Sequence, residues 1–104
     1  MNKDIKNKWV VTDPSTKQKA KQVSEYVWLY TEKGCEEVEI NLKDYTLLEI
    51  AEALSPFGYA IINPSMDSFK IMQHNVVGDY SREDSIQIAC ECLFEYHISD
   101  YYID

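Results

Sequence analysis

The chain has 104 residues, of which 45% are hydrophobic, and its formal net charge at pH 7 is −8. This length favours one domain, and the hydrophobic fraction is too high for a disordered acidic tail. The charged opening residues and the short apolar run after them lack the features of a secretory signal or a membrane span. Three cysteines without framework spacing are typical of a reducing compartment. We therefore expect a single cytoplasmic domain over residues 1–104.

The charge is distributed unevenly along the chain. Residues 1–24 contain six lysines and two acidic residues, whereas residues 25–104 contain sixteen acidic and four basic residues. An acidic body repels nucleic acid and anionic membranes and attracts basic surfaces. The sequence thus predicts a basic N-terminal segment over residues 1–24 and, for the rest, a basic protein partner with no direct nucleic-acid or membrane contact.

The first predicted element in chain order is a short strand at residues 9–12. Asp13 and Pro14 then form a helix-start signal, an N-cap followed by a first-turn proline. Residues 15–24 contain only two apolar side chains, so their pattern fits a short helix or a polar loop equally well.

A hairpin of two strands is expected next. Residues 25–31 alternate aromatic and aliphatic side chains, all of types that favour strands. Residues 32–35 contain a glycine suited to a hairpin turn. Residues 36–42 alternate between apolar and mostly acidic side chains, which indicates a half-buried strand with an acidic outer face.

The clearest local signal is a helix start at Thr46. Thr46 and Glu49 have the spacing of a capping box, in which each side chain accepts a hydrogen bond from the other residue's backbone. Pro56 disfavours helical geometry before it, and Gly58 permits a tight exit. The sequence therefore predicts a short helix from residue 47 to about residue 54.

A second hairpin and a second helix complete the chain. Residues 59–62 form an apolar strand, and residues 68–74 are expected to pair with it across a turn. Ser81 is expected to cap the final helix, whose first turn is acidic. The buried face of that helix is predicted to contain Ile86, Ala89, Cys90, Leu93 and His97. The apolar tail, residues 99–104, is expected to pack either on the sheet or against a partner.

Together these elements predict an α+β fold. It comprises a small, mostly antiparallel sheet, built from two β-hairpins and an N-terminal strand, with two to three helices on one face.

The sequence predicts no metal, cofactor or catalytic site. Cys90 and Cys92 are separated by one residue, which on a helix turns their thiols about 200° apart, so they cannot converge on one ion with His97. His74 and His97 accompany no nucleophile motif, and no glycine-rich phosphate loop is present. We therefore expect a protein that is not an enzyme.

The acidic surface is the remaining feature with functional meaning. Four side chains of the last helix follow one another at i, i+4 spacing: Glu83, Gln87, Glu91 and Glu95. Their spacing along the helix axis is about 6 Å, comparable to that of neighbouring phosphates on a nucleic-acid strand. A second acidic cluster lies on the first hairpin: Glu36, Glu37 and Glu39. These carboxylates either form a solubilising face or imitate a phosphate backbone and occupy a basic groove of another protein.

In its small size, acidity, tyrosine content and lack of a catalytic signature, the chain resembles the anti-defence proteins of bacteriophages, such as anti-CRISPR proteins. It is similar in the same respects to immunity proteins that neutralise nuclease toxins. The resemblance implies an inhibitor of a nucleic-acid-processing protein. Aromatic residues give contact area at low entropic cost, so the expected partner-binding set adds three of them to the acidic residues: Tyr26, Trp28 and Tyr30.

The alternative is a self-associating structural or regulatory module. In that case the tail residues Tyr101, Tyr102 and Ile103 and the tyrosine face of the strand at residues 25–31 would form a homodimer interface. A charge-driven complex should weaken as salt rises, whereas an apolar dimer should hardly respond.

Overall fold

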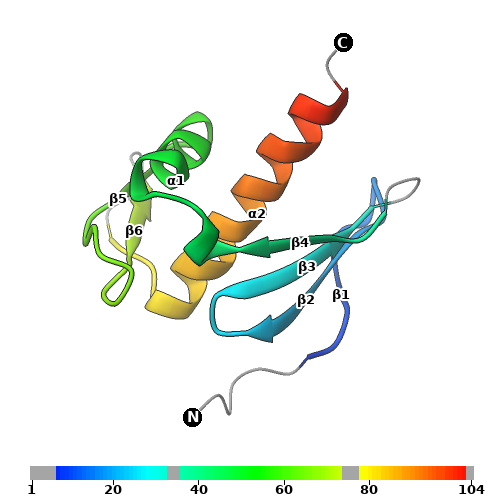
Figure 1. Cartoon of the computed structure of the whole chain (residues 1–104), viewed down its shortest axis with the longest axis horizontal. Coiled ribbons are helices and arrows are strands. Elements are labelled where there is room, and N and C mark those ends of the chain that lie inside the picture. Colours follow the sequence, from blue (N-terminus) through cyan, green and yellow to red (C-terminus); the bar gives the residue numbers. More distant parts are fainter. Residues whose placement is uncertain (1–6, 33–35, 74–77, 103–104) are drawn as a thin grey trace. The chain divides into compact units, whose positions relative to one another are not determined.

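The computed structural model describes residues 7–32, 36–73 and 78–102, with the side chains of the last helix described as far as His97. The chain divides into two compact units, residues 1–41 and residues 42–104. The architecture is α+β, as the sequence predicts. The first unit is a four-stranded antiparallel sheet, and the second contains a two-stranded hairpin and two α-helices (Figure 1).

The first unit is a meander in which each strand pairs antiparallel with the next one along the chain. Its strands are β1 (Val10–Asp13), β2 (Gln18–Ser24), β3 (Val27–Thr31) and β4 (Val38–Asn41). The register places Trp28 opposite Ile40, which confirms the predicted hairpin of residues 25–31 with residues 36–42. The expected turn at residues 33–35 lies outside the described residues.

Strand β2 occupies the segment for which a helix or a polar loop was expected, so both expectations were wrong. Gln18 and Ala20 are buried, while Lys19 is exposed and Lys21 half-buried, which is the period-two pattern of a half-buried strand. The buried amide of Gln18 is satisfied because its Oε1 accepts a 2.7 Å hydrogen bond from Thr12 Oγ1. A strand with few apolar residues can therefore present one face to the interior.

The expected helix start at Asp13 and Pro14 is instead the turn between β1 and β2. Asp13 Oδ1 accepts hydrogen bonds from Ser15 N–H at 3.1 Å and from Ser15 Oγ at 2.7 Å. These bonds lower the pKa of the Asp13 carboxyl. An aspartate that accepts a backbone N–H two or three residues ahead serves a turn and a helix N-cap equally, so the local signal alone does not distinguish them.

The second unit contains the elements η1 (Leu42–Asp44), α1 (Leu47–Leu54), η2 (Ser55–Phe57), β5 (Tyr59–Ile61), β6 (Ile71–Gln73) and α2 (Arg82–Tyr102). The capping box before α1 is confirmed: Glu49 N–H donates to Thr46 Oγ1 at 3.1 Å, and Thr46 N–H donates to Glu49 Oε1 at 2.8 Å. Gly58 takes the left-handed conformation (φ 83°) where the chain leaves η2 and enters β5. The hairpin β5–β6 is antiparallel, as predicted.

Helix α2 is longer than expected. Ser81 caps it, since Asp84 N–H donates to Ser81 Oγ at 3.1 Å. The helix continues to Tyr102, so most of the expected tail is helical, because neither glycine nor proline interrupts residues 82–102. None of the described helices, α2 included, is both long and apolar enough to cross a membrane.

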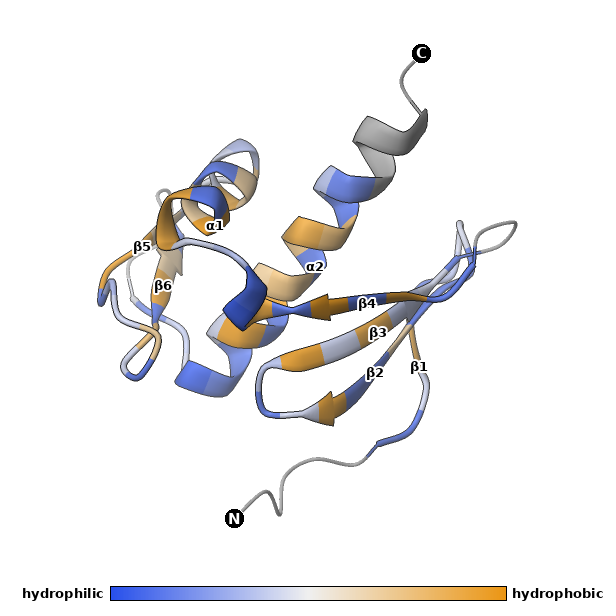
Figure 2. Cartoon of the chain, in the orientation of Figure 1, coloured by the Kyte–Doolittle hydropathy of each residue, from blue (hydrophilic) through white to orange (hydrophobic). Residues whose placement is uncertain are grey.

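The buried surface of α2 is also broader than expected. Four of the predicted residues are buried: Ile86, Ala89, Cys90 and Leu93. His97, predicted with them, is exposed, whereas Cys92 and Phe94 are buried. Viewed down the helix axis, the buried positions of α2 cover an arc of about 200°, with Cys92 at one edge and Phe94 at the other. Figure 2 shows the corresponding concentration of hydrophobic residues in the middle turns of α2, with hydrophilic residues in its first turn.

Candidate protein-binding surface

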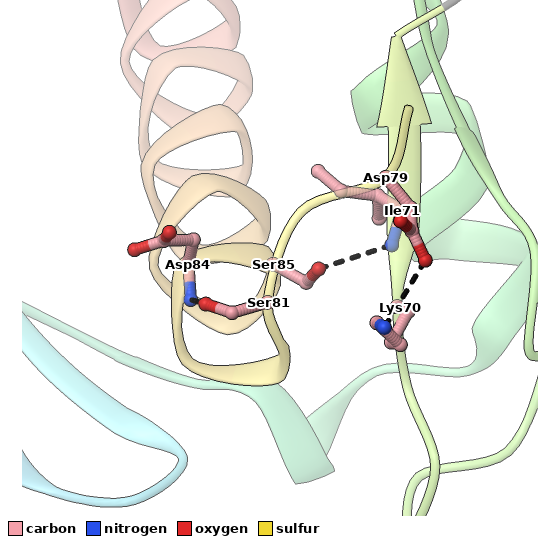
Figure 3. A network of polar contacts seen from close by, with 6 residues as sticks. All are labelled: Lys70, Ile71, Asp79, Ser81, Asp84 and Ser85. Atoms are coloured by element: carbon pink, nitrogen blue, oxygen red, sulfur yellow. Dashed lines mark hydrogen bonds and ion pairs between the residues drawn. The ribbon is translucent and has the colours of Figure 1, made fainter. Parts of the chain in front are cut away.

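A buried serine fixes α2 against the hairpin. Ser85 is fully buried, and its Oγ accepts a 3.0 Å hydrogen bond from the backbone N–H of Ile71 in β6 (Figure 3). Close by, Lys70 Nζ lies 3.1 Å from Asp79 Oδ2. This bond joins the first turn of α2 to strand β6 and satisfies a backbone donor that is buried with Ser85 and Ile71.

The acidic row predicted on α2 is present on one continuous helix. Glu83 is exposed, and Gln87, Glu91 and Glu95 are half-buried. Cys92 and Phe94 bound the buried sector of about 200°, which leaves an outer sector of about 160°. Glu91 and Glu95 both lie in that sector, one helical turn apart.

The acidic cluster on the first hairpin has a different setting. Glu36 and Glu37 are exposed just before β4, and Glu39 is exposed within it. The register places Glu39 opposite Leu29, which in turn lies opposite Lys21. The outer face of the sheet therefore carries both signs of charge, and the surface around Glu39 is not uniformly acidic.

The two units differ accordingly in net charge. Residues 1–41 contain seven lysines and seven acidic residues, which cancel. Residues 42–104 contain three basic and eleven acidic residues. The whole net charge of −8 thus belongs to the second unit.

The aromatic residues expected to bind a partner lie mostly in the interior. Tyr30 is 1% exposed and Tyr26 is also buried, while Trp28 is half-buried and stacks on Tyr30 with ring centroids 6.4 Å apart. Buried rings have little surface to give to a partner or to a second copy of the chain. We therefore assign Tyr26 and Tyr30 to the packing of the protein itself. The side chains of the tail residues 101–103 lie outside the described residues.

A hollow beside the acidic row was not expected from the sequence. It has a volume of about 120 Å³ and is lined by residues from η2, β5 and α2: Phe57, Tyr59, Ile88, Glu91, Cys92 and Glu95. Four of these lie at i, i+3, i+4 and i+7 on one face of α2. That spacing is visible in the sequence, but the sequence does not show that Phe57 and Tyr59 lie opposite it.

The two cysteine thiols on α2 have raised pKa values. Burial, together with the charges of Glu91 and Glu95, raises the pKa of the Cys92 thiol to about 12. Burial also raises the pKa of Cys90. Because the thiolate is the reactive form, both groups are poor nucleophiles at neutral pH.

The described histidine, cysteine and acidic side chains do not gather into a metal site. Among them, no group of three or more histidine, cysteine or acidic residues is placed to hold a metal ion. Cys90 and Cys92 are buried thiols on an unbroken helix. His97 is exposed, and His74 lies outside the described residues.

Comparisons with protein-family models, with curated proteins and with solved structures gave no match to this chain. The functional argument therefore rests on the charge and geometry of the second unit.

Proposed function

We propose that this protein is a non-catalytic acidic binding protein that inhibits a nucleic-acid-processing protein by occupying its basic, nucleic-acid-binding surface. The observation that carries the proposal is the confinement of the whole net charge of −8 to residues 42–104. A small unit with that charge attracts basic surfaces and repels nucleic acid itself. Complementary charge accelerates association with such a partner and orients it.

Within the second unit, α2 is the element best suited to make the contact. Glu91 and Glu95 are half-buried and lie one turn apart on the side of α2 away from its buried sector, and Glu83 is exposed in the first turn, where Ser85 bonds the helix to the hairpin. The carboxylates of Glu91 and Glu95 are about 6 Å apart along the helix axis, a spacing similar to that of neighbouring phosphates on a strand, and Glu83 lies about 12 Å from Glu91. Rigid placement lowers the entropy lost on binding.

The first unit serves as an internal control for this proposal. Glu37 and Glu39 are also exposed carboxylates, but they lie on a unit whose lysines balance its acids. We assign partner binding to α2 and not to these two residues. Removing two charges from either unit changes the net charge of the protein equally.

The test is capture of a partner from bacterial lysate with the intact chain as bait. We expect a nucleic-acid-binding protein that is retained at about 0.05 M salt and released at about 0.5 M salt, where exposed charges are screened. With the partner identified, Glu91→Gln combined with Glu95→Gln should weaken its binding about tenfold. Glu37→Gln combined with Glu39→Gln should leave the affinity nearly unchanged.

A competition arm distinguishes a nucleic-acid-binding surface from another basic surface. An oligonucleotide added to the complex should displace the protein from its partner, because both ligands need the same groove. Salt-independent capture, equal effects of the two double variants, or a complex that tolerates saturating oligonucleotide would each contradict the proposal.

A further inference from the structure

The hollow on the second unit has the size of a single side chain. Its volume of about 120 Å³ is well below the roughly 300 Å³ at which pockets begin to hold drug-sized ligands. It is open to solvent, and Phe57 at its rim is 48% exposed although it is a large hydrophobic residue. An exposed aromatic ring beside a small open hollow is a suitable anchor point for a side chain of another protein.

The lining combines two kinds of chemistry. Phe57, Tyr59 and Ile88 provide aromatic and aliphatic walls, and Glu91 and Glu95 add two carboxylates one helical turn apart. Tyr59 is held edge-on against Tyr80 with ring centroids 5.8 Å apart, which fixes the orientation of that wall. Such a site matches a ligand with a long apolar stem and a positively charged head.

The hollow also carries a negative potential on its wall. The charges of Glu91 and Glu95 contribute to the raised pKa of the Cys92 thiol, which lines the same hollow. The field that disfavours a thiolate at this position favours a cation. A positively charged head group is therefore stabilised there, whereas an anion is opposed.

We infer that this hollow receives the side chain of an arginine from the partner protein. A guanidinium group is planar, so it stacks on the aromatic rings and donates hydrogen bonds to more than one carboxylate oxygen at once. A lysine ammonium is a compact point charge that is more strongly hydrated and forms no such stack. Arginine is also enriched at the centres of protein interfaces and of nucleic-acid-binding grooves.

This inference rests on the proposed function, because it specifies which part of the basic partner the acidic helix contacts. It adds a position and a residue type that charge alone does not give. The carboxylates set where the guanidinium head lies, and Phe57 and Tyr59 set where the stem and the plane of the head lie.

The experiment is a titration of the intact, isotope-labelled chain with n-butylguanidinium, followed by NMR. We expect saturable shifts of the side-chain signals of Tyr59, Ile88 and Cys92. The isosteric neutral probe n-butylurea should leave these signals unshifted, and n-butylammonium should bind several-fold more weakly. Glu91→Gln combined with Glu95→Gln should weaken binding of n-butylguanidinium about tenfold.

Two further variants separate the hollow from the general charge of the unit. Glu52→Gln combined with Asp67→Asn removes the same charge from exposed positions of the same unit and should leave the probe affinity unchanged. Phe57→Ser removes an aromatic wall without changing the charge and should weaken binding several-fold. Equal shifts with n-butylurea, preference for n-butylammonium, or equal loss in both double variants would overturn the inference.

The outcomes also separate this inference from the proposed function. If the partner is captured in a salt-dependent manner but the hollow does not bind n-butylguanidinium, the arginine assignment fails and the proposed function stands. If no nucleic-acid-binding protein is captured in a salt-dependent manner, the proposed function fails, whether or not the hollow binds the probe.

Discussion

The two units of this protein differ in how their charges are arranged and in how each unit is stabilised. In residues 1–41 lysines and acids balance, and strand-to-strand pairing accounts for the architecture. Residues 42–104 contain eleven acidic and three basic residues. This unit is stabilised by the buried side of α2, by the capping box at Thr46 and by the hydrogen bond of Ser85. Self-repulsion opposes compaction of the second unit. The net charge of −8 for the whole chain does not show this difference between the two units.

The largest expected effect comes from the core of the second unit. Phe94→Ala removes a fully buried ring of α2 and should lower the free energy of unfolding by about 3–5 kcal/mol. Tyr96→Ala, at a 61% exposed position on the same helix, should change it by less than about 0.5 kcal/mol. Denaturant unfolding monitored by helical circular dichroism measures both, and similar losses in the two variants would contradict the assigned burial.

The same variant sharpens the comparison of the units. Both tryptophans, Trp9 and Trp28, belong to the first unit, so their fluorescence reports on the sheet. Helical circular dichroism reports on the second unit, which contains both α-helices. For Phe94→Ala we expect the unfolding transition seen by helical circular dichroism to shift by the full loss of stability. A shift seen only in tryptophan fluorescence would contradict the assignment of Phe94 to the core of the second unit.

The hydrogen bond between α2 and the hairpin should have the next largest effect. Ser85→Ala leaves the Ile71 N–H without its acceptor and should cost about 1–3 kcal/mol. Hydrogen exchange at the Ile71 amide should accelerate by the corresponding factor. Ser68→Ala, at an exposed position, is the matched control and should have little effect on either quantity.

Removal of the helix cap should cost less. Thr46→Ala removes the acceptor for the Glu49 N–H and should lower the free energy of unfolding by about 1 kcal/mol. Thr46→Ser keeps a side-chain oxygen in place and should restore most of that loss. A serine variant as unstable as the alanine variant would mean that the threonine methyl, and not the cap, is responsible.

The smallest effects concern two exposed carboxylates, one in each unit. The Lys70 side chain lowers the pKa of Asp79 through a hydrogen bond and its charge, whereas hydrogen bonds from Ser15 lower the pKa of Asp13. Each stabilising contribution is present above the ordinary carboxyl pKa and is lost as the pH falls through the lowered value. NMR titration should show that Lys70→Met raises the pKa of Asp79 and that added salt affects Asp79 more than Asp13.

Much of the second unit could be predicted from the sequence because its signals are local. A capping box at Thr46, a glycine at Gly58 and a serine cap at Ser81 each act within one turn of chain, and all three are confirmed. The end of α2 and the exposure of His97 were not predicted. The absence of glycine and proline from residues 82–102 permits the longer helix but does not set where it ends, and the width of its buried face depends on tertiary packing, which periodicity alone does not contain.

The first unit was harder to predict because strand β2 is defined by its neighbours. Its sequence has little apolar content, and the buried Gln18 accepts a hydrogen bond from Thr12 in the adjacent strand. Such a pairing joins residues six positions apart through a turn whose signal also fits a helix start. The hollow beside Glu91 was missed for a related reason, since Phe57 and Tyr59 reach it from a different part of the chain.

The two outer strands of the meander are poorly suited to edge-to-edge growth of the sheet. Strands β1 and β4 are the outer strands of the described sheet, and each has backbone groups on one side that could template a further strand. Val10 and Val11 on β1 are exposed, which would favour such growth. Both strands have only four residues, however, and an irregularity in register between Val11 and Asp13 interrupts β1. A short, irregular border is a poor template, so the sheet can remain open without recruiting further chains.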